Sequence, residues 1–435
     1  MDGTGLAPET YLPRVVDAKV DRYLRLFGAV EISGAKWCGK TWTALRHGGS
    51  VSYIDDEYDV AMADPSMVTM GEHPHVIDEW QLVPGIWDAV RREVDRRGVR
   101  GGWILTGSST PRFRGEGSER LPKHSGAGRI GRIRMHPMSL AESGDSTSEI
   151  SLAGLFRHEF HPCKVKSDTR ELIGLTCRGG WPAAIGLPPA DALAIAREYL
   201  EVFLREAIPV LGKSSDTAGR LLASLARNLG QAATYKTISS DMYGGEADGG
   251  PFVSTDTISS YLSLFRDSYL MEELRGWVPQ TRSPKRLSIK PKRYLADPSL
   301  AVARLGMDPA SLEADWQTFG LIFESMCVRD LLVYASAMTE IGFEPLRYYR
   351  DDTGLEVDAI VELSDGRWAA FEIKTSDDKV ADADASLKRL RTKLCDRAGA
   401  RVRPPEFMAV LVGASQYARE LDEGIYSIPI RAFGP

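Results

Sequence analysis

The sequence has few cysteines and no long apolar run, and both absences narrow the class of protein. Of its 435 residues only five are cysteines, and these are scattered and odd in number. They predict reduced thiols in a cytoplasmic protein and argue against a disulfide framework. Because no stretch of about 18 apolar residues occurs, we expect no membrane span. The first residues lack a basic start followed by an apolar stretch, so we expect no secretion signal.

A strong charge imbalance is also absent. The net charge is −6, with 43% apolar and 26% charged residues, which is ordinary for a globular protein. This balance gives no general argument for nucleic-acid binding, although it permits a local basic surface. The length predicts two or three domains, each large enough for its own core.

What the sequence does contain is a complete phosphate-binding loop. Residues 34–41 fit the pattern G-x4-G-K-[ST], with a predicted strand over 28–33 before it and a helix starting at Thr41 after it. Backbone N–H groups of such a loop bind phosphate oxygens, Lys40 reaches the β- and γ-phosphates, and the Thr41 hydroxyl ligates Mg²⁺. The loop therefore predicts ATP and Mg²⁺ as cofactors. The cofactor-binding residues predicted from it are Gly34, Ala35, Lys36, Trp37, Cys38, Gly39, Lys40 and Thr41.

Two acidic residues follow a second predicted strand, about forty residues further on. Asp78 and Glu79 come directly after the apolar pair Val76 and Ile77. We expect Asp78 to hold Mg²⁺ through water and Glu79 to act as general base on the attacking water. The alternative is a strand end capped by solvated acids. A third strand over 102–109 ends in hydroxyls, and Thr106, Ser108 or Ser109 is expected to sense the γ-phosphate, with Ser108 counted among the cofactor-binding residues. The alternative is an ordinary strand-to-loop turn.

The order of the predicted elements indicates three regions. Strands alternating with helices predict a parallel α/β sheet and an ATPase domain over 1–147, preceded by a helix over 10–27. Residues 148–300 are predicted to be a helical linker with a winged helix: three helices, then strands over 271–277 and 292–296. Residues 301–435 are predicted to form a smaller α/β sheet.

The predicted wing is basic and predicts contacts with DNA phosphates. It has no acidic residue between 274 and 296. The alternatives are a solvated hairpin or a winged helix used for protein contacts. The wing cations, within the range 275–293, are Arg275, Arg282, Lys285, Arg286, Lys290, Lys292 and Arg293.

A second constellation lies near the C-terminus. Strand alternation places Glu372 and Lys374 on one face, Asp358 can lie opposite them on a paired strand, and a helix over 319–336 offers Glu324. Three carboxylates can bind Mg²⁺ and activate water for phosphodiester cleavage, with Lys374 orienting that water. The alternative is an internal ion-pair cluster without turnover.

These residues resemble the core of the PD-(D/E)xK nuclease-like fold. The whole chain resembles a prokaryotic family of AAA-type ATPases with a C-terminal domain of unknown function that contains this core. The resemblance implies ATP binding and hydrolysis and supplies no pathway. The matching landmarks are residues 11–14, 34–41, 77–81, 105–109, 131–140, 179–182, 294–297, 323–324, 356–358 and 372–374.

Arg129 and Arg132 are candidate arginine fingers. They follow a segment over 110–128 that is rich in Gly, Ser, Arg and Pro. In ATPases of this type a cation near this point meets the γ-phosphate, either in cis or from a neighbouring subunit of a homo-oligomer. The alternative is a basic strand at the sheet edge.

Two functions from different classes remain open at this stage. The first is an ATP-driven machine that binds or processes nucleic acid through the wing and the nuclease-like sheet. The second is a nucleotide-dependent switch or scaffold for protein partners, with an inactive C-terminal sheet. A metabolic kinase is discounted because no acceptor lid is recognisable.

Overall fold

The computed structural model describes residues 6–108, 125–243, 253–280, 283–396 and 402–435. The chain divides into two compact units. Unit 1 comprises Met1–Pro137 and Asp267–Leu270, and unit 2 comprises Met138–Arg266 and Met271–Pro435. The chain therefore passes between the units three times. Among the described residues, no helix combines the length and apolarity needed to cross a membrane.

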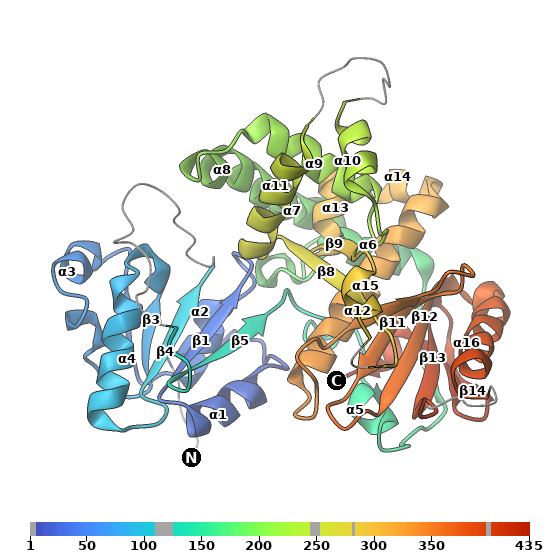
Figure 1. The fold of residues 1–435 in the computed structure, drawn as a ribbon, viewed down its shortest axis with the longest axis horizontal. Coiled ribbons are helices and arrows are strands. Elements are labelled where there is room, and N and C mark those ends of the chain that lie inside the picture. Colours follow the sequence, from blue (N-terminus) through green and yellow to red (C-terminus); the bar gives the residue numbers. More distant parts are fainter. Residues whose placement is uncertain (1–5, 109–124, 244–252, 281–282, 397–401) are drawn as a thin grey trace. The chain divides into compact units, whose positions relative to one another are not determined.

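Unit 1 is built on a five-stranded sheet in the order β2-β3-β4-β1-β5, and every pairing in it is parallel (Figure 1). This confirms the predicted parallel α/β sheet. The strands are β1 (Ala29–Gly34), β2 (Ser50–Tyr53), β3 (His75–Asp78), β4 (Trp103–Gly107) and β5 (Ile130–Met135). The helices are α1 (Asp17–Leu26), α2 (Lys40–His47), α3 (Tyr58–Ala63) and α4 (Gly85–Arg97).

The core of unit 1 forms because its central strands are buried on both faces. All residues of β1, β3 and β4 are buried. Helix α4 covers the sheet with Ile86, Val90 and Val94, which recur every fourth residue and are all buried. Helix α1 begins at Asp17, later than predicted. Of the residues before it, Arg14 hydrogen-bonds to the phosphate-binding loop and Tyr11 to Thr43 of α2.

Unit 2 contains a nine-stranded sheet in the order β7-β14-β15-β13-β12-β11-β10-β8-β9. Helix α16 packs on this sheet, with Val380, Leu387 and Leu390 buried against strand residues such as Met408 and Val410 (Figure 1). The strands of this sheet are β7 (Cys163–Lys164), β8 (Met271–Gly276), β9 (Lys292–Leu295), β10 (Arg347–Arg350), β11 (Glu356–Glu362), β12 (Trp368–Ser376), β13 (Phe407–Ala414), β14 (Tyr417–Asp422) and β15 (Ile425–Pro429).

Most helices of unit 2 lie between residues 169 and 337, and α16 follows strand β12. The longer helices are α6 (Thr169–Arg178), α7 (Pro189–Val202), α9 (Ser215–Arg227), α10 (Tyr235–Met242), α11 (Thr255–Asp267), α13 (Pro298–Arg304), α14 (Pro309–Ala314), α15 (Trp316–Ala337) and α16 (Val380–Cys395). Short elements are α5 (Leu152–Leu155), α8 (Ile208–Val210), α12 (Lys285–Ser288), β6 (Ile150–Ser151) and β16 (Phe433–Gly434).

The region predicted as a winged helix contains three helices followed by an antiparallel pair, β8 and β9. Strand β8 also pairs in parallel with β10, so the two strands form one edge of the nine-stranded sheet. That sheet includes strands from both sides of residue 300, the predicted domain boundary. The winged helix and the three-domain division stay predictions.

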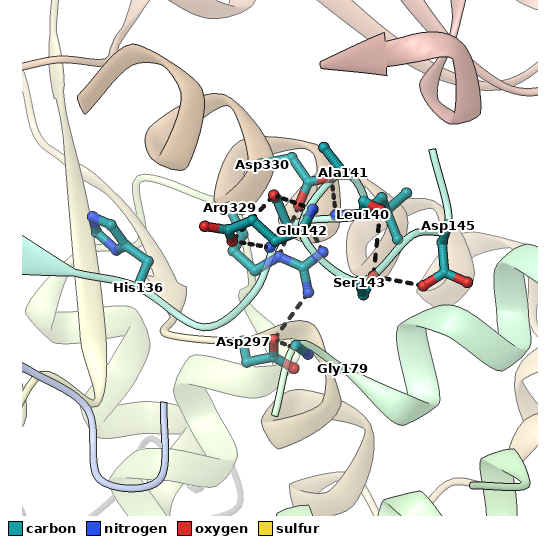
Figure 2. Close-up of polar contacts among 12 residues, drawn as sticks. His136, Leu140, Ala141, Glu142, Ser143, Asp145, Gly179, Asp297, Arg329 and Asp330 are labelled. Atoms are coloured by element: carbon teal, nitrogen blue, oxygen red, sulfur yellow. Dashed lines mark hydrogen bonds and ion pairs between the residues drawn. The ribbon is translucent and has the colours of Figure 1, made fainter. Parts of the chain in front are cut away.

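A buried ion-pair network fixes the first residues of unit 2 (Figure 2). Arg329 of α15 contacts Asp297 at 3.0 Å and Asp330 at 2.6 Å, and all three side chains are buried. Asp330 accepts a hydrogen bond from the backbone N–H of Leu140 (3.1 Å), and Asp297 accepts one from Gly180 (2.8 Å). One charged cluster thus holds the chain just after Met138 against α15 and the start of α13.

Candidate nucleotide-binding site and C-terminal acid cluster

The phosphate-binding loop lies between β1 and α2, and its two glycines are required for different reasons. Gly39 has φ 99°, a left-handed conformation that favours glycine, and it precedes the first residue of α2. A Cβ atom on Gly34 would lie 2.1 Å from the carbonyl oxygen of Met135 on the neighbouring strand β5. Gly34 therefore allows close approach of two backbones, a constraint that the motif alone does not show.

Lys40 and Thr41 start α2 and point toward the loop and toward β3. The buried Lys40 ammonium donates to the carbonyl oxygen of Ala35, a loop residue, at 2.8 Å. The Thr41 hydroxyl donates to Asp78 Oδ1 at 3.0 Å. A hydroxyl and a carboxylate oxygen side by side are ligands that Mg²⁺ prefers, so this donor set fits the predicted ion.

Asp78 lies at the carboxyl end of β3, the edge at which parallel sheets bind ligands. Its carboxylate also accepts a hydrogen bond from the Thr106 hydroxyl. Burial raises the pKa of Asp78, and the hydrogen bonds from Thr106 and Thr41 oppose this effect without cancelling it. A nearby cation would stabilise the ionised form.

Glu79 occupies a left-handed backbone conformation with φ 56°, which is uncommon for a residue with a side chain. Its carboxylate accepts hydrogen bonds from the Ser108 hydroxyl, at 2.9 and 3.1 Å, and from the Gln81 amide. Ser108 therefore contacts the predicted general base. Ser109, the next hydroxyl in the sequence, lies outside the described residues.

Sequence reasoning missed the N-terminal residues that hold the loop. Arg14 is buried and donates to the carbonyl oxygens of Cys38 (2.7 Å) and His136 (2.8 Å). The Tyr11 hydroxyl donates to Asp17 and lies 3.2 Å from the hydroxyl of Thr43 on α2. The only available signal was that residues 11–14 are a landmark of the resembling family.

Arg129 lies away from the phosphate-binding loop of its own chain. Its carbonyl oxygen bonds to the N–H of Ala29, at the start of β1, whereas the phosphate-binding loop begins at the other end of that strand. The Arg129 guanidinium instead pairs with Asp95 at 2.8 Å. About half of the Arg129 side chain is exposed, which leaves it accessible to a neighbouring subunit. Its role as an arginine finger in trans stays a prediction.

Arg132 lies in the middle of β5, opposite Glu31 in the strand register. It pairs with Glu31 at 3.3 Å and lies over the Trp87 ring, 5.0 Å from its centroid. Burial raises the pKa of Glu31, and the Arg132 guanidinium partly offsets this effect. Arg132 thus already compensates a buried carboxylate within unit 1.

The predicted C-terminal residues come together within unit 2. Three carboxylates converge there: Asp358 of β11, Glu372 of β12 and Glu324 of α15. They surround two lysines, one of which is Lys374 of β12. Lys374 Nζ lies 2.6 Å from Glu372 and 3.7 Å from Asp358. Glu372 also accepts a hydrogen bond from Ser386 of α16 at 2.8 Å.

The second lysine of this acid cluster was not predicted to belong to it. Lys292 on β9 has its Nζ 2.8 Å from Glu356, 3.3 Å from Glu324 and 3.5 Å from Asp358. Burial lowers the pKa of Lys292. The carboxylates of Glu324, Asp358 and Glu356 together raise this pKa by more than burial lowers it, so the net shift is upward. The ammonium is therefore charged.

Two carboxylates of the cluster have strongly perturbed pKa values. Burial, followed by the charge of Asp358, raises the pKa of Glu324 to about 7. The same two causes raise the pKa of Glu372 to about 7, against the opposing effects of Lys374 and Ser386. Burying several acids close together thus favours their protonated form.

The predicted metal site at Glu324, Asp358 and Glu372 needs correction. Among the described residues, no group of three or more His, Cys, Asp and Glu side chains is arranged to hold a metal ion. The physical reason is that lysine ammonium groups lie between these carboxylates. The residues present do not fit Mg²⁺ in this arrangement, although they do converge as predicted.

The prediction that Lys292 and Arg293 contact DNA phosphates is also wrong. Both are buried, and Arg293 pairs with Glu273 at 3.1 Å. Arg286 pairs with Glu362 and Arg275 with Glu344. The sequence window 274–296 contains no acid, but acids just outside it neutralise these cations: Glu273 of β8 itself, Glu344 before β10 and Glu362 of β11. Arg282 and the side chain of Lys285 lie outside the described part of the chain.

Comparison with known proteins finds three family matches along the chain. Residues 27–144 match a family described as an AAA domain. Residues 169–311 match a domain of unknown function (DUF8612), and residues 319–433 match another (DUF4143). Unit 1 therefore carries a P-loop domain of the AAA ATPase class.

The chain is also similar to an uncharacterized protein of Mycobacterium tuberculosis strain H37Rv, Rv2008c. The two are 26% identical over 373 residues, 82% of this chain and 72% of that protein. The uncharacterized protein Mb2031c of Mycobacterium bovis matches with the same values.

Two solved structures show weak similarity. The Walker-type ATPase PABY2304 of Pyrococcus abyssi has a TM-score of 0.44 and 13% identity, covering 70% of this chain and 99% of its own. The ORC1 protein of Aeropyrum pernix in complex with DNA has a TM-score of 0.29 and 16% identity, covering 71% of this chain and 97% of its own.

Proposed function

We propose that this protein is a Mg²⁺-dependent ATPase. The observation that supports this most directly is the meeting of Thr41, Asp78 and Glu79 beside Lys40 at one edge of the sheet. Lys40 would bind the β- and γ-phosphates after exchanging its bond to Ala35 for phosphate oxygens. Thr41 and Asp78 would hold Mg²⁺, which neutralises phosphate charge, and Glu79 would orient and deprotonate the attacking water.

Two substitutions at this site test the proposal. Lys40→Ala should abolish ATP binding, measured by calorimetry, because it removes the cation that meets the phosphates. Glu79→Gln should still bind ATP but hydrolyse it roughly 10²- to 10⁴-fold more slowly, because the general base is lost. Lys236→Ala, which removes an exposed lysine from α10 in unit 2, is the control and should behave as wild type. Equal turnover in wild type and Glu79→Gln would refute the proposal.

The function that ATP serves is best described as a nucleotide-dependent switch. Gly34 of the phosphate-binding loop pairs with Met135, the last residue of β5. The chain enters unit 2 at Met138, and the Arg329 network fixes the residues that follow. A change at the loop can therefore be transmitted along the chain. In this function the C-terminal sheet is inactive as a nuclease, and the switch engages a protein partner.

Coupling of ATP to nucleic-acid processing is the second candidate function. The convergence of Glu324, Asp358, Glu372 and Lys374 favours it. It requires stimulation of ATP hydrolysis by DNA and metal-dependent DNA cleavage that Lys374→Ala abolishes. If DNA does not change the rate of ATP hydrolysis and neither single- nor double-stranded DNA is cleaved, nucleic-acid processing is excluded and the nucleotide-dependent switch is retained.

We also propose that Arg129 acts in trans in a homo-oligomer. Hydrolysis per protomer would then rise with protein concentration and would fall in Arg129→Ala at every concentration. A concentration-independent rate that Arg129→Ala does not change would exclude this role.

A further inference from the structure

The side chain of Lys292 lies inside the acid cluster, and its ammonium contacts three carboxylates and one aromatic ring. Only 4% of this side chain is exposed. Its Nζ lies within 3.5 Å of carboxylate oxygens from Glu324, Glu356 and Asp358, which come from α15 and β11. A lysine ammonium has three N–H donors, so three carboxylates satisfy it completely.

An aromatic face completes the surroundings of this ammonium. The Tyr348 ring centroid lies 5.5 Å from Lys292 Nζ, and the negative face of an aromatic ring attracts such a cation. The ring carbons provide no ligand for a divalent metal. Tyr294 further fixes the site, because its hydroxyl donates to Glu324 at 2.6 Å. The enclosure therefore suits an ammonium group better than a metal ion.

The distances lead to the same conclusion. Mg²⁺ requires six oxygens at about 2.0–2.1 Å in near-octahedral geometry. The oxygens around Lys292 Nζ lie at 2.8, 3.3 and 3.5 Å, all within the distance of an ion pair. The other oxygen of Asp358 accepts from the N–H of Ile373 at 2.9 Å and faces Lys374. Both oxygens of the central carboxylate are thus occupied.

We infer that Lys292 is the built-in cation of the acid cluster, and that its ammonium takes the place of the divalent metal that phosphodiester cleavage there would need. The cluster then joins β9, β11, β12 and α15 as a charged core of the sheet, without turnover. This inference does not depend on ATP hydrolysis in unit 1, and it favours the switch over nucleic-acid processing. Lys292 lies before residue 301, so the nuclease-like segment alone does not reveal it.

The test is Mn²⁺ binding by the full chain without nucleotide, measured by calorimetry and by the thermal midpoint. Wild type and Asp358→Asn should show the same Mn²⁺ binding, because the cluster of the wild type holds no metal. Lys292→Met keeps the length of the side chain and removes its charge. This variant should gain an EDTA-reversible Mn²⁺ stabilisation that the double variant Lys292→Met, Asp358→Asn lacks. Arg157→Met, which removes a surface cation paired with Glu159, is the matched control and should gain none.

Each outcome decides the inference. Mn²⁺ binding to wild type that is lost in Asp358→Asn would overturn it, as would a folded Lys292→Met that gains no Mn²⁺ binding. If Lys292→Met does not fold even with Mn²⁺, the comparison of wild type with Asp358→Asn still decides, because only a metal-holding cluster predicts a difference in Mn²⁺ binding. ATP hydrolysis measured on the same wild-type sample tests the ATPase separately.

Discussion

The guanidinium of Arg14 donates a hydrogen bond of 2.7 Å to the carbonyl oxygen of Cys38, inside the phosphate-binding loop. Its other terminal nitrogen donates to His136, just beyond β5. One buried cation thus ties the loop to the strand that leaves unit 1. The loop N–H groups can be aimed at phosphate only if the carbonyls of the same peptides are held in place, and Arg14 does this for Cys38.

Arg14→Ala should therefore weaken ATP binding by about tenfold or more. The substitution leaves two buried carbonyl oxygens without their charged donor, and each such loss costs about 1–3 kcal/mol. Arg14→Lys should give an intermediate affinity, because a single ammonium lacks the planar fork that reaches both carbonyls. A calorimetric ATP titration measures both variants. Wild-type affinity in Arg14→Ala would show that the contact does not organise the loop.

Gly34→Ala should destabilise the protein by about 1–3 kcal/mol, because the new Cβ would lie 2.1 Å from the Met135 carbonyl oxygen. Gly320→Ala is the matched control: Gly320 lies within α15, and a Cβ there would meet no atom within 4 Å. That variant should be more stable by about 0.5–1 kcal/mol. Urea unfolding of both variants compares them with wild type, and a tolerated Gly34→Ala would mean that β5 can move away.

Glu324 should make stability depend on pH. Its pKa rises from an ordinary value of 4.5 to about 7 on folding, so between these values the native state holds a proton that the unfolded state has lost. The free energy of unfolding from this group therefore falls as pH rises from about 4.5 to about 7. Glu324→Gln removes this dependence. Denaturant unfolding at several pH values should show the variant gaining stability relative to wild type as pH rises, and parallel curves would contradict the assignment.

Arg329→Met should destabilise unit 2 by about 3–5 kcal/mol, because it leaves Asp297 and Asp330 buried without their cation. Arg157→Met is the control, since the Arg157–Glu159 pair is more than half exposed and such pairs contribute little. The measurement is the thermal midpoint of the full chain. A similar small shift in both variants would mean that the network in Figure 2 is not essential.

The nucleotide site could be predicted from sequence because it depends on local patterns. Gly39, Lys40 and Thr41 lie within one turn of a helix start, and Asp78 ends an apolar strand. Parallel strands bring their carboxyl ends to one edge, so the meeting of Thr41 with Asp78 follows from the fold class. The contact of Ser108 with Glu79 was not foreseen, because side-chain directions at strand ends are set by packing.

The sequence by itself determined the P-loop, the parallel sheet of unit 1, and the set of acids that converge in unit 2. Each rests on spacing or on strand periodicity, which are properties of neighbouring residues. Only the tertiary structure decided what neutralises those acids. Lys292 reaches Glu324, Glu356 and Asp358 from a strand 32 to 66 residues away, and ion pairing in a buried site depends on distance in space. Lys292, which the sequence predicts as a DNA contact, therefore forms part of the core of unit 2.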